Sequence, residues 1–415
     1  MNAAILTIGT EILIGQVIDT NSAWMANELN QIGVSIQTII SISDSGDEIK
    51  STVEQLLNKY DLVLVTGGLG PTSDDITTQI LCEVFNSKLV FHELTLQHIE
   101  SIFAKRNLPL TELNRNQALV PECCEVLFNS NGTAPGMWFT KNCSILVAMP
   151  GVPFEMKGIM EQYVIPKLAA LRKDSVIVHK TIQTFGLPES FLAQKLEEWE
   201  RDMPSSISIA YLPSPISIRV RLSSVGTNKV EIEKAIDQQV QKLLTIIPNY
   251  VFGFDDDSLA SAVGVLLNKY GKSLSLAESC TGGTISQLIT QISGSSAYYK
   301  GGVVAYSNEI KVNFLNVDNA LIIEHGAVSQ QVVEAMANGV RAKFKTDYSI
   351  ATSGIAGPTG ATPGKPVGLV WIAVSTPEGT ISKSFAFSND RERNILRSSV
   401  TALNMLRLEL VILTK

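Results

Sequence analysis

Apolar and polar positions divide the first 170 or so residues into short apolar runs that alternate with amphipathic stretches. Four apolar runs end in glycine or turn residues and predict strands over 3–9, 34–42, 62–68 and 144–151. The segment 21–33 has a helical pattern, with Asn21 or Ser22 placed to cap its first amides and Gly33 to end it. Strands that alternate with helices predict an α/β fold with a parallel sheet, whose functional loops lie at the carboxyl ends of the strands.

The pattern changes near residue 175 and again near residue 255. Residues 173–254 contain several apolar strands and a helix near 191–201, which predicts a small α+β module without obvious chemistry. Residues 255–415 open on an acidic stretch that is placed to cap a helix, and they continue with strands and helices as a second α/β domain. The chain therefore divides into segments 1–172, 173–254 and 255–415.

Composition agrees with a globular protein of several domains. Of the 415 residues, 45% are hydrophobic and 18% are charged. The net charge is -7, and no run of five or more Lys and Arg residues occurs. Nonspecific binding to nucleic acid or to an acidic membrane is therefore disfavoured, whereas a local basic pocket for a phosphorylated small molecule remains compatible with the sequence.

Cysteine usage and the N-terminus predict a cytoplasmic protein. The five cysteines are odd in number and show no CxxC spacing, as expected for reduced intracellular thiols. The N-terminus lacks the basic region and the cleavage site of a signal peptide, and no apolar run approaches the ~18 residues that span a bilayer.

The densest chemical signal is AESCTGG at 277–283, between an apolar strand and a helical pattern. Ser279 is predicted to emerge at this strand-to-helix corner, where the amides of residues 280–283 suit a phosphate or an oxyanion. A serine nucleophile needs an adjacent base. None of the four histidines lies in this motif, so a lysine is the more economical candidate.

Lys311 is the candidate base, because it follows an apolar strand in the run VVAYSNEIK. Partial desolvation lowers the pKa of a lysine and lets it take the serine proton, with Tyr306 relaying the proton or orienting the amine. A later strand and glycine-rich loop, with Ser353 and the amides of residues 354–357, is placed to complete the pocket.

Ordinary structural roles remain open for these residues. A Ser-Thr-Gly-Gly corner is more often a helix cap and a tight turn than a catalytic site. Lys311 is also compatible with a solvated helix position and Tyr306 with an ordinary strand aromatic. Cys280 is a rival nucleophile, although a cysteine without a nearby histidine is more often buried and inert.

The N-terminal segment carries a second candidate site in GTEILIGQVIDTN, TGGLGPTSDDIT and PGVPFEMKGI. Its glycines bring backbone amides against phosphates, and its carboxylates are hard ligands for Mg²⁺ or a similar divalent cation. The residues concerned are Gly67, Gly68, Gly70, Glu11, Asp19, Asp74 and Asp75. The alternative is a tight turn followed by a helix that Asp74 or Asp75 caps.

The chain resembles the CinA family of competence/damage-inducible proteins, and residues 256–415 resemble its nicotinamide mononucleotide amidohydrolase domain. The matching stretches are AESCTGG, GSSAYYKGGVVAYSNEIK, HGAVS, SGIAGPTG and KPVGLVW. The resemblance implies that Ser279 attacks the carboxamide, that Tyr306 and Lys311 activate it, and that no cofactor is needed. It also implies an arginine near the C-terminus that holds the substrate phosphate. Ser353, where relatives commonly carry threonine, is a further catalytic candidate, and the candidate substrate-binding residues are Thr281, Gly282, Gly283, Asn308, Gly354 and Arg391.

Arg391 is the residue that the resemblance assigns to the substrate phosphate, with Arg393 as a second choice. In this sequence Asn389 stands where relatives usually have the glycine of Gly-Asp-Arg. The expected reaction converts nicotinamide mononucleotide to nicotinic acid mononucleotide and ammonia.

The N-terminal motifs resemble a three-layer molybdopterin-binding fold. This resemblance implies a pyrophosphatase that acts on ADP-ribose with a divalent cation, with Asp75 as metal ligand or base. It also suggests a homodimer. Two alternatives remain: a nucleotide- or pterin-binding regulatory protein linked to competence or DNA damage, and an amidase for a different carboxamide.

Overall fold

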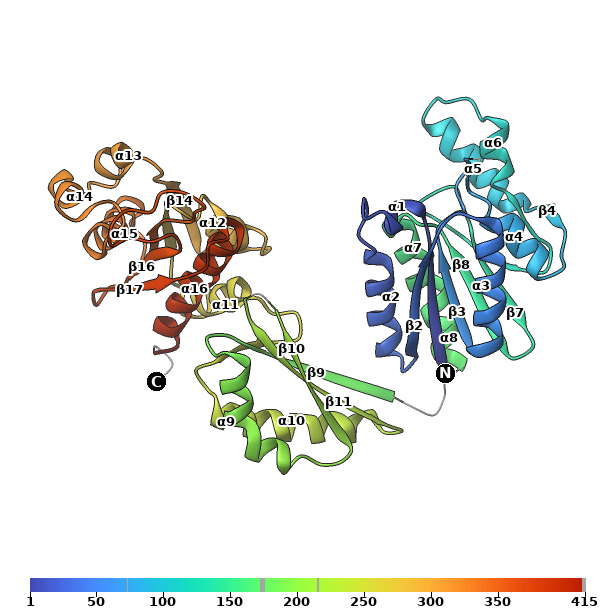
Figure 1. The fold of residues 1–415 in the computed structure, drawn as a ribbon, viewed down its shortest axis with the longest axis horizontal. Coiled ribbons are helices and arrows are strands. Elements are labelled where there is room, and N and C mark those ends of the chain that lie inside the picture. Colours follow the sequence, from blue (N-terminus) through green and yellow to red (C-terminus); the bar gives the residue numbers. More distant parts are fainter. Residues whose placement is uncertain (73, 172–175, 215, 413–415) are drawn as a thin grey trace. The chain divides into compact units, whose positions relative to one another are not determined.

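The apolar runs near the start of the chain form neighbouring strands in the computed structural model of the protein (Figure 1). The structure describes residues 1–72, 74–171, 176–214 and 216–412. Each of the four predicted strands exists, and four parallel strands lie side by side as β2 (Ser35–Ile42), β1 (Asn2–Ile8), β3 (Leu62–Thr66) and β8 (Ser144–Met149). The sheet continues with two antiparallel strands, β7 (Gly136–Lys141) and β6 (Glu125–Leu127).

Helices cover both faces of this sheet, which gives the three layers that the resemblance implied. One apolar core joins the sheet to α3 (Gly46–Lys59) and α4 (Thr77–Val84). The other core joins it to α2 (Thr20–Gln31), α7 (Pro153–Ile159), the π-helical turn η1 (Met160–Val164) and α8 (Ile165–Leu171). The strands contribute mainly aliphatic side chains to both cores, because the strands of a parallel sheet are buried on both faces.

The predicted cap of α2 is wrong by two to three positions. Asp19, rather than Asn21 or Ser22, is the N-cap, and its carboxylate accepts a hydrogen bond from the Ser22 amide at 2.9 Å. A carboxylate at this position also interacts favourably with the helix dipole. Gly33 follows the helix with φ of +78°, as expected of a residue that ends a helix.

Several elements of the N-terminal part were not anticipated from the sequence. They are α1 (Thr10–Leu13), β4 (Leu89–Phe91), α5 (Glu93–Lys105), α6 (Glu112–Asn116) and β5 (Leu119–Pro121). Strands β4 and β5 pair with each other as a separate antiparallel ribbon. Strands of three residues carry too few alternating positions to be recognised from a pattern.

The segment 176–254 forms an α+β module, as predicted. Its sheet has the order β10-β11-β9-β12. The strands are β9 (Val176–Thr184), β10 (Ile207–Pro213), β11 (Ile218–Gly226) and β12 (Val251–Phe254), and the helices are α9 (Glu189–Arg201) and α10 (Lys229–Ile246). The indole of Trp199 on α9 donates to the carbonyl of Gln239 on α10 at 3.2 Å, so the two helices contact each other.

The C-terminal part is a second α/β domain with a five-stranded sheet of order β14-β13-β15-β16-β17. The strands are β13 (Leu274–Glu278), β14 (Tyr299–Val304), β15 (Tyr348–Gly354), β16 (Leu369–Ser375) and β17 (Thr380–Ala386). The first three are parallel and the last two antiparallel. The carboxyl ends of β13, β14 and β15 therefore meet at one edge of the sheet.

Helices also cover both faces of the second sheet. One face packs against α11 (Leu259–Tyr270), α12 (Thr284–Thr290) and α16 (Arg391–Ile412). The other packs against α15 (Gln330–Phe344), and the connecting elements are η2 (Ser295–Ala297), α13 (Asn308–Asn313) and α14 (Asn319–His325). The acidic stretch that was predicted to cap α11 does not do so, because Ser258 is the N-cap and forms a capping box with Ser261.

The chain divides into two compact units. One contains Met1–Val178 with Ser224–Glu233, and the other contains His179–Ser223 with Lys234–Lys415. The module and the C-terminal domain thus belong mostly to one unit, while the three segment boundaries proposed from the sequence stay predictions. Within the described residues, no helix is both long and apolar enough to cross a membrane.

Candidate functional site

Ser279 lies at the strand-to-helix corner that the sequence indicated. It directly follows β13, and its amide donates to the Thr352 carbonyl of the neighbouring strand β15 at 3.1 Å. Gly282 closes a tight turn by donating to the Ser279 carbonyl at 3.1 Å. Gly282 and Gly283 have φ of +62° and +101°, conformations that favour glycine, and α12 begins only after them.

Lys311 lies beside Ser279, as the sequence predicted. Its Nζ is 3.2 Å from the Ser279 Oγ and donates to the carbonyls of Ala305 at 2.7 Å and Tyr306 at 3.5 Å. The lysine is only 2% exposed and Ser279 is 9% exposed. Burial lowers the pKa of Lys311 below its usual value, because the charged amine is deprived of water.

The topology explains why these two residues meet. Strands β13 and β14 are parallel neighbours, and the Ala305 amide donates to the Glu278 carbonyl at 2.7 Å just beyond β14. Ser307 then caps α13 by accepting from the Ile310 amide at 3.2 Å. This short helix turns Lys311 back toward the end of β13.

Cys280 is not a competitive nucleophile in this environment. Its side chain is buried, and burial raises the pKa of the thiol to about 12. A thiol with such a pKa is protonated at neutral pH, and the thiolate is the nucleophilic form. The geometry therefore favours Ser279 of the two adjacent candidates.

The start of α12 is not free to bind an anion, contrary to expectation. The buried carboxylate of Glu278 accepts from the amides of Gly283 and Ile285 at 3.0 Å and of Ser286 at 2.8 Å. It also accepts from the Ser286 hydroxyl at 2.7 Å. Glu278 was not expected from the sequence, where the signal was a single charged residue at the end of an otherwise uncharged strand.

Two amides of the corner remain available. In the part of the chain that the structure describes, no main-chain carbonyl accepts a hydrogen bond from the amides of Cys280 and Thr281. They are the two middle residues of the turn that Gly282 closes. Adjacent unpaired amides after a nucleophile are a common source of oxyanion stabilisation.

The side chains of Tyr306 and Arg391 contact each other. Tyr306 is 63% exposed, and its hydroxyl accepts from Arg391 at 3.2 Å. The same guanidinium donates to the Gly357 carbonyl of the glycine-rich loop at 2.7 Å. Arg393 instead lies 3.9 Å from the Asp390 carboxylate. Tyr306 contacts Lys311 through its main-chain carbonyl only, so a direct proton relay through its hydroxyl has no support in this geometry.

The remaining predicted residues have mainly structural contacts. The buried Ser353 hydroxyl donates to the Ala327 carbonyl at 2.7 Å, and the Thr281 hydroxyl lies 2.8 Å from that of Thr352. A Cβ at Gly354 would lie 2.6 Å from a methyl of Val370, which explains a glycine there.

Asn308 and Asn394 illustrate an expected and an overlooked polar residue. Asn308 is exposed at the first position of α13, where the structure gives it no contact with Ser279. Asn394 is fully buried, and its amide donates to the carbonyls of Ala356 at 3.0 Å and Ser388 at 2.7 Å. Asn394 therefore fastens the glycine-rich loop to the start of α16.

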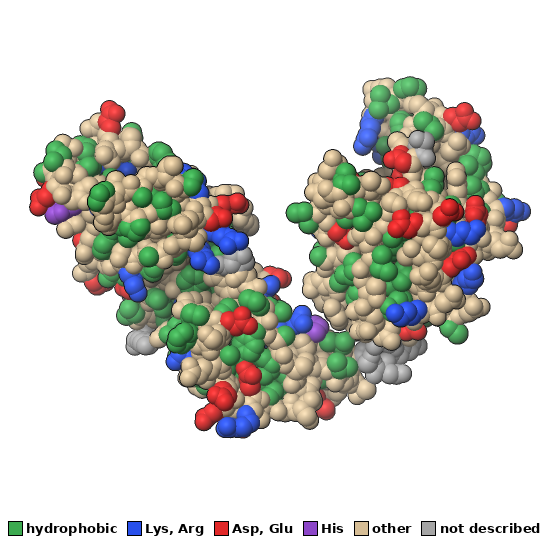
Figure 2. Space-filling model, in the orientation of Figure 1, with side chains coloured by type: hydrophobic (Ala, Val, Ile, Leu, Met, Phe, Trp, Pro, Cys, Tyr) green, Lys and Arg blue, Asp and Glu red, His purple; other side chains and the backbone are tan. Residues whose placement is uncertain are grey.

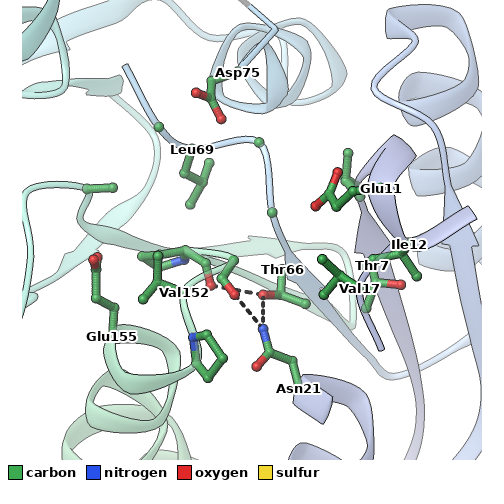
Figure 3. Close-up of a pocket in the computed structure, with 18 of the residues that line it drawn as sticks. Thr7, Glu11, Ile12, Val17, Asn21, Thr66, Leu69, Asp75, Val152 and Glu155 are labelled. Atoms are coloured by element: carbon green, nitrogen blue, oxygen red, sulfur yellow. Dashed lines mark hydrogen bonds between the residues drawn. The ribbon is translucent and has the colours of Figure 1, made fainter. Parts of the chain in front are cut away.

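The N-terminal motifs converge on a cavity of about 450 Å³ at the carboxyl ends of β1, β3 and β8 (Figure 3). The Asn21 side chain donates to the Thr66 hydroxyl at 3.3 Å and to the Gly151 carbonyl at 2.8 Å. Thr66 in turn donates to the Pro150 carbonyl at 2.9 Å. This network fixes two strand ends and the start of α2 beneath the cavity.

Acidic side chains from several elements surround this cavity. In Figure 3, Glu11, Asp75 and Glu155 extend from different segments of the chain. The carboxylates that line it are Glu11, Asp19, Asp44, Asp74, Asp75 and Glu155. Among the described residues that line the cavity, none is Lys, Arg or His. A phosphate therefore meets negative charge here unless a cation accompanies it.

Some of these carboxylates are already hydrogen-bonded. Asp44 accepts from the amide and hydroxyl of Thr10, both at 2.9 Å. Asp75 accepts from the amide of Thr72 at 3.0 Å and its hydroxyl at 2.5 Å. No three His, Cys, Asp or Glu side chains in the described ranges gather closely enough to hold a metal by themselves. This donor set suits Mg²⁺ that is held by one or two carboxylates and by substrate phosphates.

Comparison with known proteins identifies the family. The chain is 47% identical to the CinA-like protein of Flavobacterium psychrophilum, over 99% of both chains. The chain belongs to the CinA family. A CinA-like protein of Cytophaga hutchinsonii is 44% identical over 98% of both chains.

Three family models match successive parts of the chain. Residues 4–170 match "Probable molybdopterin binding domain", residues 179–253 match "Damage-inducible protein CinA KH domain" and residues 256–410 match "CinA C-terminal domain". The chain is also similar to a solved structure of the competence damage-inducible protein A from Klebsiella pneumoniae. That similarity covers 37% of this chain and 95% of the other, with 36% identity and a TM-score of 0.36. The three family models confirm the three-part fold that was expected from the sequence.

Proposed function

We propose that the C-terminal domain hydrolyses the carboxamide of nicotinamide mononucleotide to nicotinic acid mononucleotide and ammonia. The observation that carries this proposal is the 3.2 Å contact between the Ser279 Oγ and the buried Lys311 Nζ. A lysine with a lowered pKa next to a serine is a suitable general base. The substrate itself is inferred from the family resemblance of the surrounding motifs.

Each step of the reaction has a residue to perform it. Neutral Lys311 takes the Ser279 proton as the Oγ attacks the carboxamide carbon, and the amides of Cys280 and Thr281 stabilise the oxyanion. Lys311 then gives the proton to the leaving nitrogen, and the C–N bond breaks to release ammonia. Water attacks the resulting ester while Lys311 takes one of its protons. The C–Oγ bond then breaks, Lys311 returns the proton to the Ser279 Oγ, and the acid product loses its remaining proton to solvent and leaves as the carboxylate.

The test of this proposal is ammonia release from nicotinamide mononucleotide by the purified protein, measured with and without EDTA. We expect turnover in both, because every step uses protein groups. Nicotinamide riboside and a simple pyridine carboxamide serve as comparison substrates. Equal turnover of all three would favour an amidase for a different carboxamide.

Arg391 is the proposed ligand of the substrate phosphate. Replacing Arg391 by Ala is expected to raise KM for nicotinamide mononucleotide about 10- to 100-fold, since charge-assisted hydrogen bonds contribute about 1.5–3 kcal/mol. Steady-state kinetics measure the change. Arg393→Ala is the matched control, because that side chain pairs with Asp390 instead. A larger effect at Arg393 would reverse the assignment.

For the N-terminal domain we propose a metal-dependent pyrophosphatase that acts on ADP-ribose. The supporting observation is the acidic cavity without a basic lining residue, which fits a diphosphate only with a divalent cation. Glu11 and Asp75 are the proposed protein ligands, and the amides of Gly68 and Gly70 are the proposed donors to the phosphates. The expected role of the Gly67 amide is wrong, because that amide donates to the Met149 carbonyl at 3.1 Å. The cation supplies charge neutralisation and an activated water when bound.

ADP-ribose is therefore expected to stabilise the protein only when Mg²⁺ is present. We expect a rise in the midpoint of thermal unfolding with ADP-ribose and Mg²⁺ together, and little change with ADP-ribose in EDTA. Asp75→Asn is expected to weaken the joint effect. Equal stabilisation by ADP-ribose in EDTA would contradict the cation requirement.

The alternative is a nucleotide- or pterin-binding regulatory protein without N-terminal catalysis. Direct binding to nucleic acid has little support: residues 179–253 match a KH model but contain no GxxG, the loop with which KH modules hold backbone nucleotides. Basic side chains are also scattered on the face shown in Figure 2. Stabilisation by oligonucleotides in the same assay would favour the alternative.

A homodimer remains the expected assembly. Analytical ultracentrifugation of the purified protein tests it, because the sedimentation rate depends on the mass of the assembly.

A further inference from the structure

The buried Glu278 carboxylate carries an inference that rests on the proposed amidase function. Glu278 is 1% exposed and is the last residue of β13, directly before Ser279. A buried carboxylate is costly unless its oxygens are hydrogen-bonded. Here four donors satisfy it: the amides of Gly283, Ile285 and Ser286, and the Ser286 hydroxyl.

The contacts of Glu278 span the whole corner. Its main-chain carbonyl accepts from the Ala305 amide at 2.7 Å, and the carbonyl of the same Ala305 accepts from the Lys311 amine. Its side chain reaches five to eight residues ahead to the start of α12. Glu278 is therefore linked both to the segment that carries the base and to the helix that follows the nucleophile.

We propose that Glu278 is a positioning residue for Ser279, which holds the corner in its reactive geometry without contacting substrate. The carboxylate occupies the first amides of α12 and thereby excludes substrate anions from them. It leaves the Cys280 and Thr281 amides as donors of the corner that no main-chain carbonyl occupies. The phosphate then binds elsewhere, on the side of Arg391.

Glutamine is the informative replacement because it keeps the size and removes two acceptor sites. In one orientation its NH₂ group faces the amides of Gly283 and Ile285, and in the other it faces the amide of Ser286 and a hydroxyl that can turn to accept. At least one backbone donor therefore meets an NH₂ group in either orientation. The corner must then shift. Misplacement of a reacting group by about 1 Å typically costs on the order of 100-fold in rate.

Glu278→Gln is expected to lower kcat for nicotinamide mononucleotide about 10- to 100-fold while KM stays within about threefold. A merely structural loss would reduce the amount of folded protein and leave the kcat of the folded fraction unchanged. The folded fraction of each variant is therefore measured by circular dichroism and thermal unfolding. Glu309→Gln is the matched control, because Glu309 is exposed on α13 and should tolerate the same change.

A second readout does not depend on the substrate. The rate at which a fluorophosphonate labels Ser279 reports the reactivity of its hydroxyl, and we expect Glu278→Gln to slow labelling by a factor similar to that in kcat. Labelling of wild type without ammonia release would overturn the proposed substrate and not the role of Glu278. Unchanged labelling and unchanged kcat in folded Glu278→Gln would overturn the role.

Milder variants keep the proposal testable if Glu278→Gln does not fold. Tyr299→Phe removes the hydroxyl that donates to Ser286 at 2.9 Å, and Ser286→Ala removes one donor to Glu278. Each is expected to lower kcat and the labelling rate a few-fold, with the larger loss for Ser286→Ala. If each of the two variants keeps the wild-type kcat and the wild-type labelling rate, the proposal is contradicted.

Discussion

Ser279→Ala is expected to reduce ammonia release from nicotinamide mononucleotide by at least about 1,000-fold. The substitution removes the only atom that forms the covalent bond in the proposed reaction. Removal of one hydroxyl from a small side chain leaves the Ser279 amide free to donate to Thr352 as before. The loss should therefore fall on kcat, while substrate binding persists.

Cys280→Ala is the control that separates the two adjacent nucleophile candidates. Burial raises the pKa of this thiol to about 12, so its removal should change kcat by no more than a few-fold. Circular dichroism establishes that each variant is folded, and single-turnover kinetics establish whether an acyl-enzyme forms. Substantial turnover by Ser279→Ala, or loss of activity in Cys280→Ala alone, would contradict the assignment of the nucleophile.

The fold was predictable where single elements are long and strongly patterned. The strands near 3–9 and 62–68 were found because parallel strands buried on both faces have continuous apolar runs. Strands β4 and β5 were missed because three residues give no periodic signal. The cap of α2 was misplaced because several residues near its start are capable caps, and only the backbone conformation selects Asp19.

The candidate site was predictable in its residues and less so in its contacts. Ser279 and Lys311 are 32 positions apart, and their contact follows from two adjacent parallel strands whose carboxyl ends meet. The sequence did not indicate that Glu278 fills the start of α12, because a charged residue at a strand end is usually solvated. It also gave no indication that the Tyr306 hydroxyl meets Arg391, since that contact joins segments 85 positions apart.

The two candidate sites differ in how they accommodate a phosphorylated substrate. The C-terminal site has a guanidinium beside the glycine-rich loop, whereas the N-terminal cavity is lined by six carboxylates. In the two proposed reactions, the substrate phosphate would bind the first site through protein charge and the second through a cation. EDTA should therefore separate the two proposed activities within one chain.

Lys311→Met is expected to lower kcat about 100- to 10,000-fold, the usual contribution of a general base. In wild type, kcat should rise with pH until Lys311 is deprotonated and then level off. Because burial lowers the pKa of Lys311, this plateau should begin below pH 10.5, the usual value for lysine. The pH dependence of kcat shows at which pH the plateau begins. An activity that is independent of pH over this range, or a fully active Lys311→Met, would remove Lys311 from the mechanism.

The same lowered pKa makes a second, independent prediction about stability. Below the folded-state pKa, both folded and unfolded chains bind the proton, and wild type bears the full cost of a buried charge. Between that pKa and 10.5 the unfolded chain binds more protons, so the stability of wild type rises with pH relative to Lys311→Met. Thermal unfolding of both proteins from about pH 6 to pH 10 measures this difference. A difference that stays constant would mean that Lys311 titrates like an exposed lysine, and the buried amine would then be charged and unable to accept the Ser279 proton.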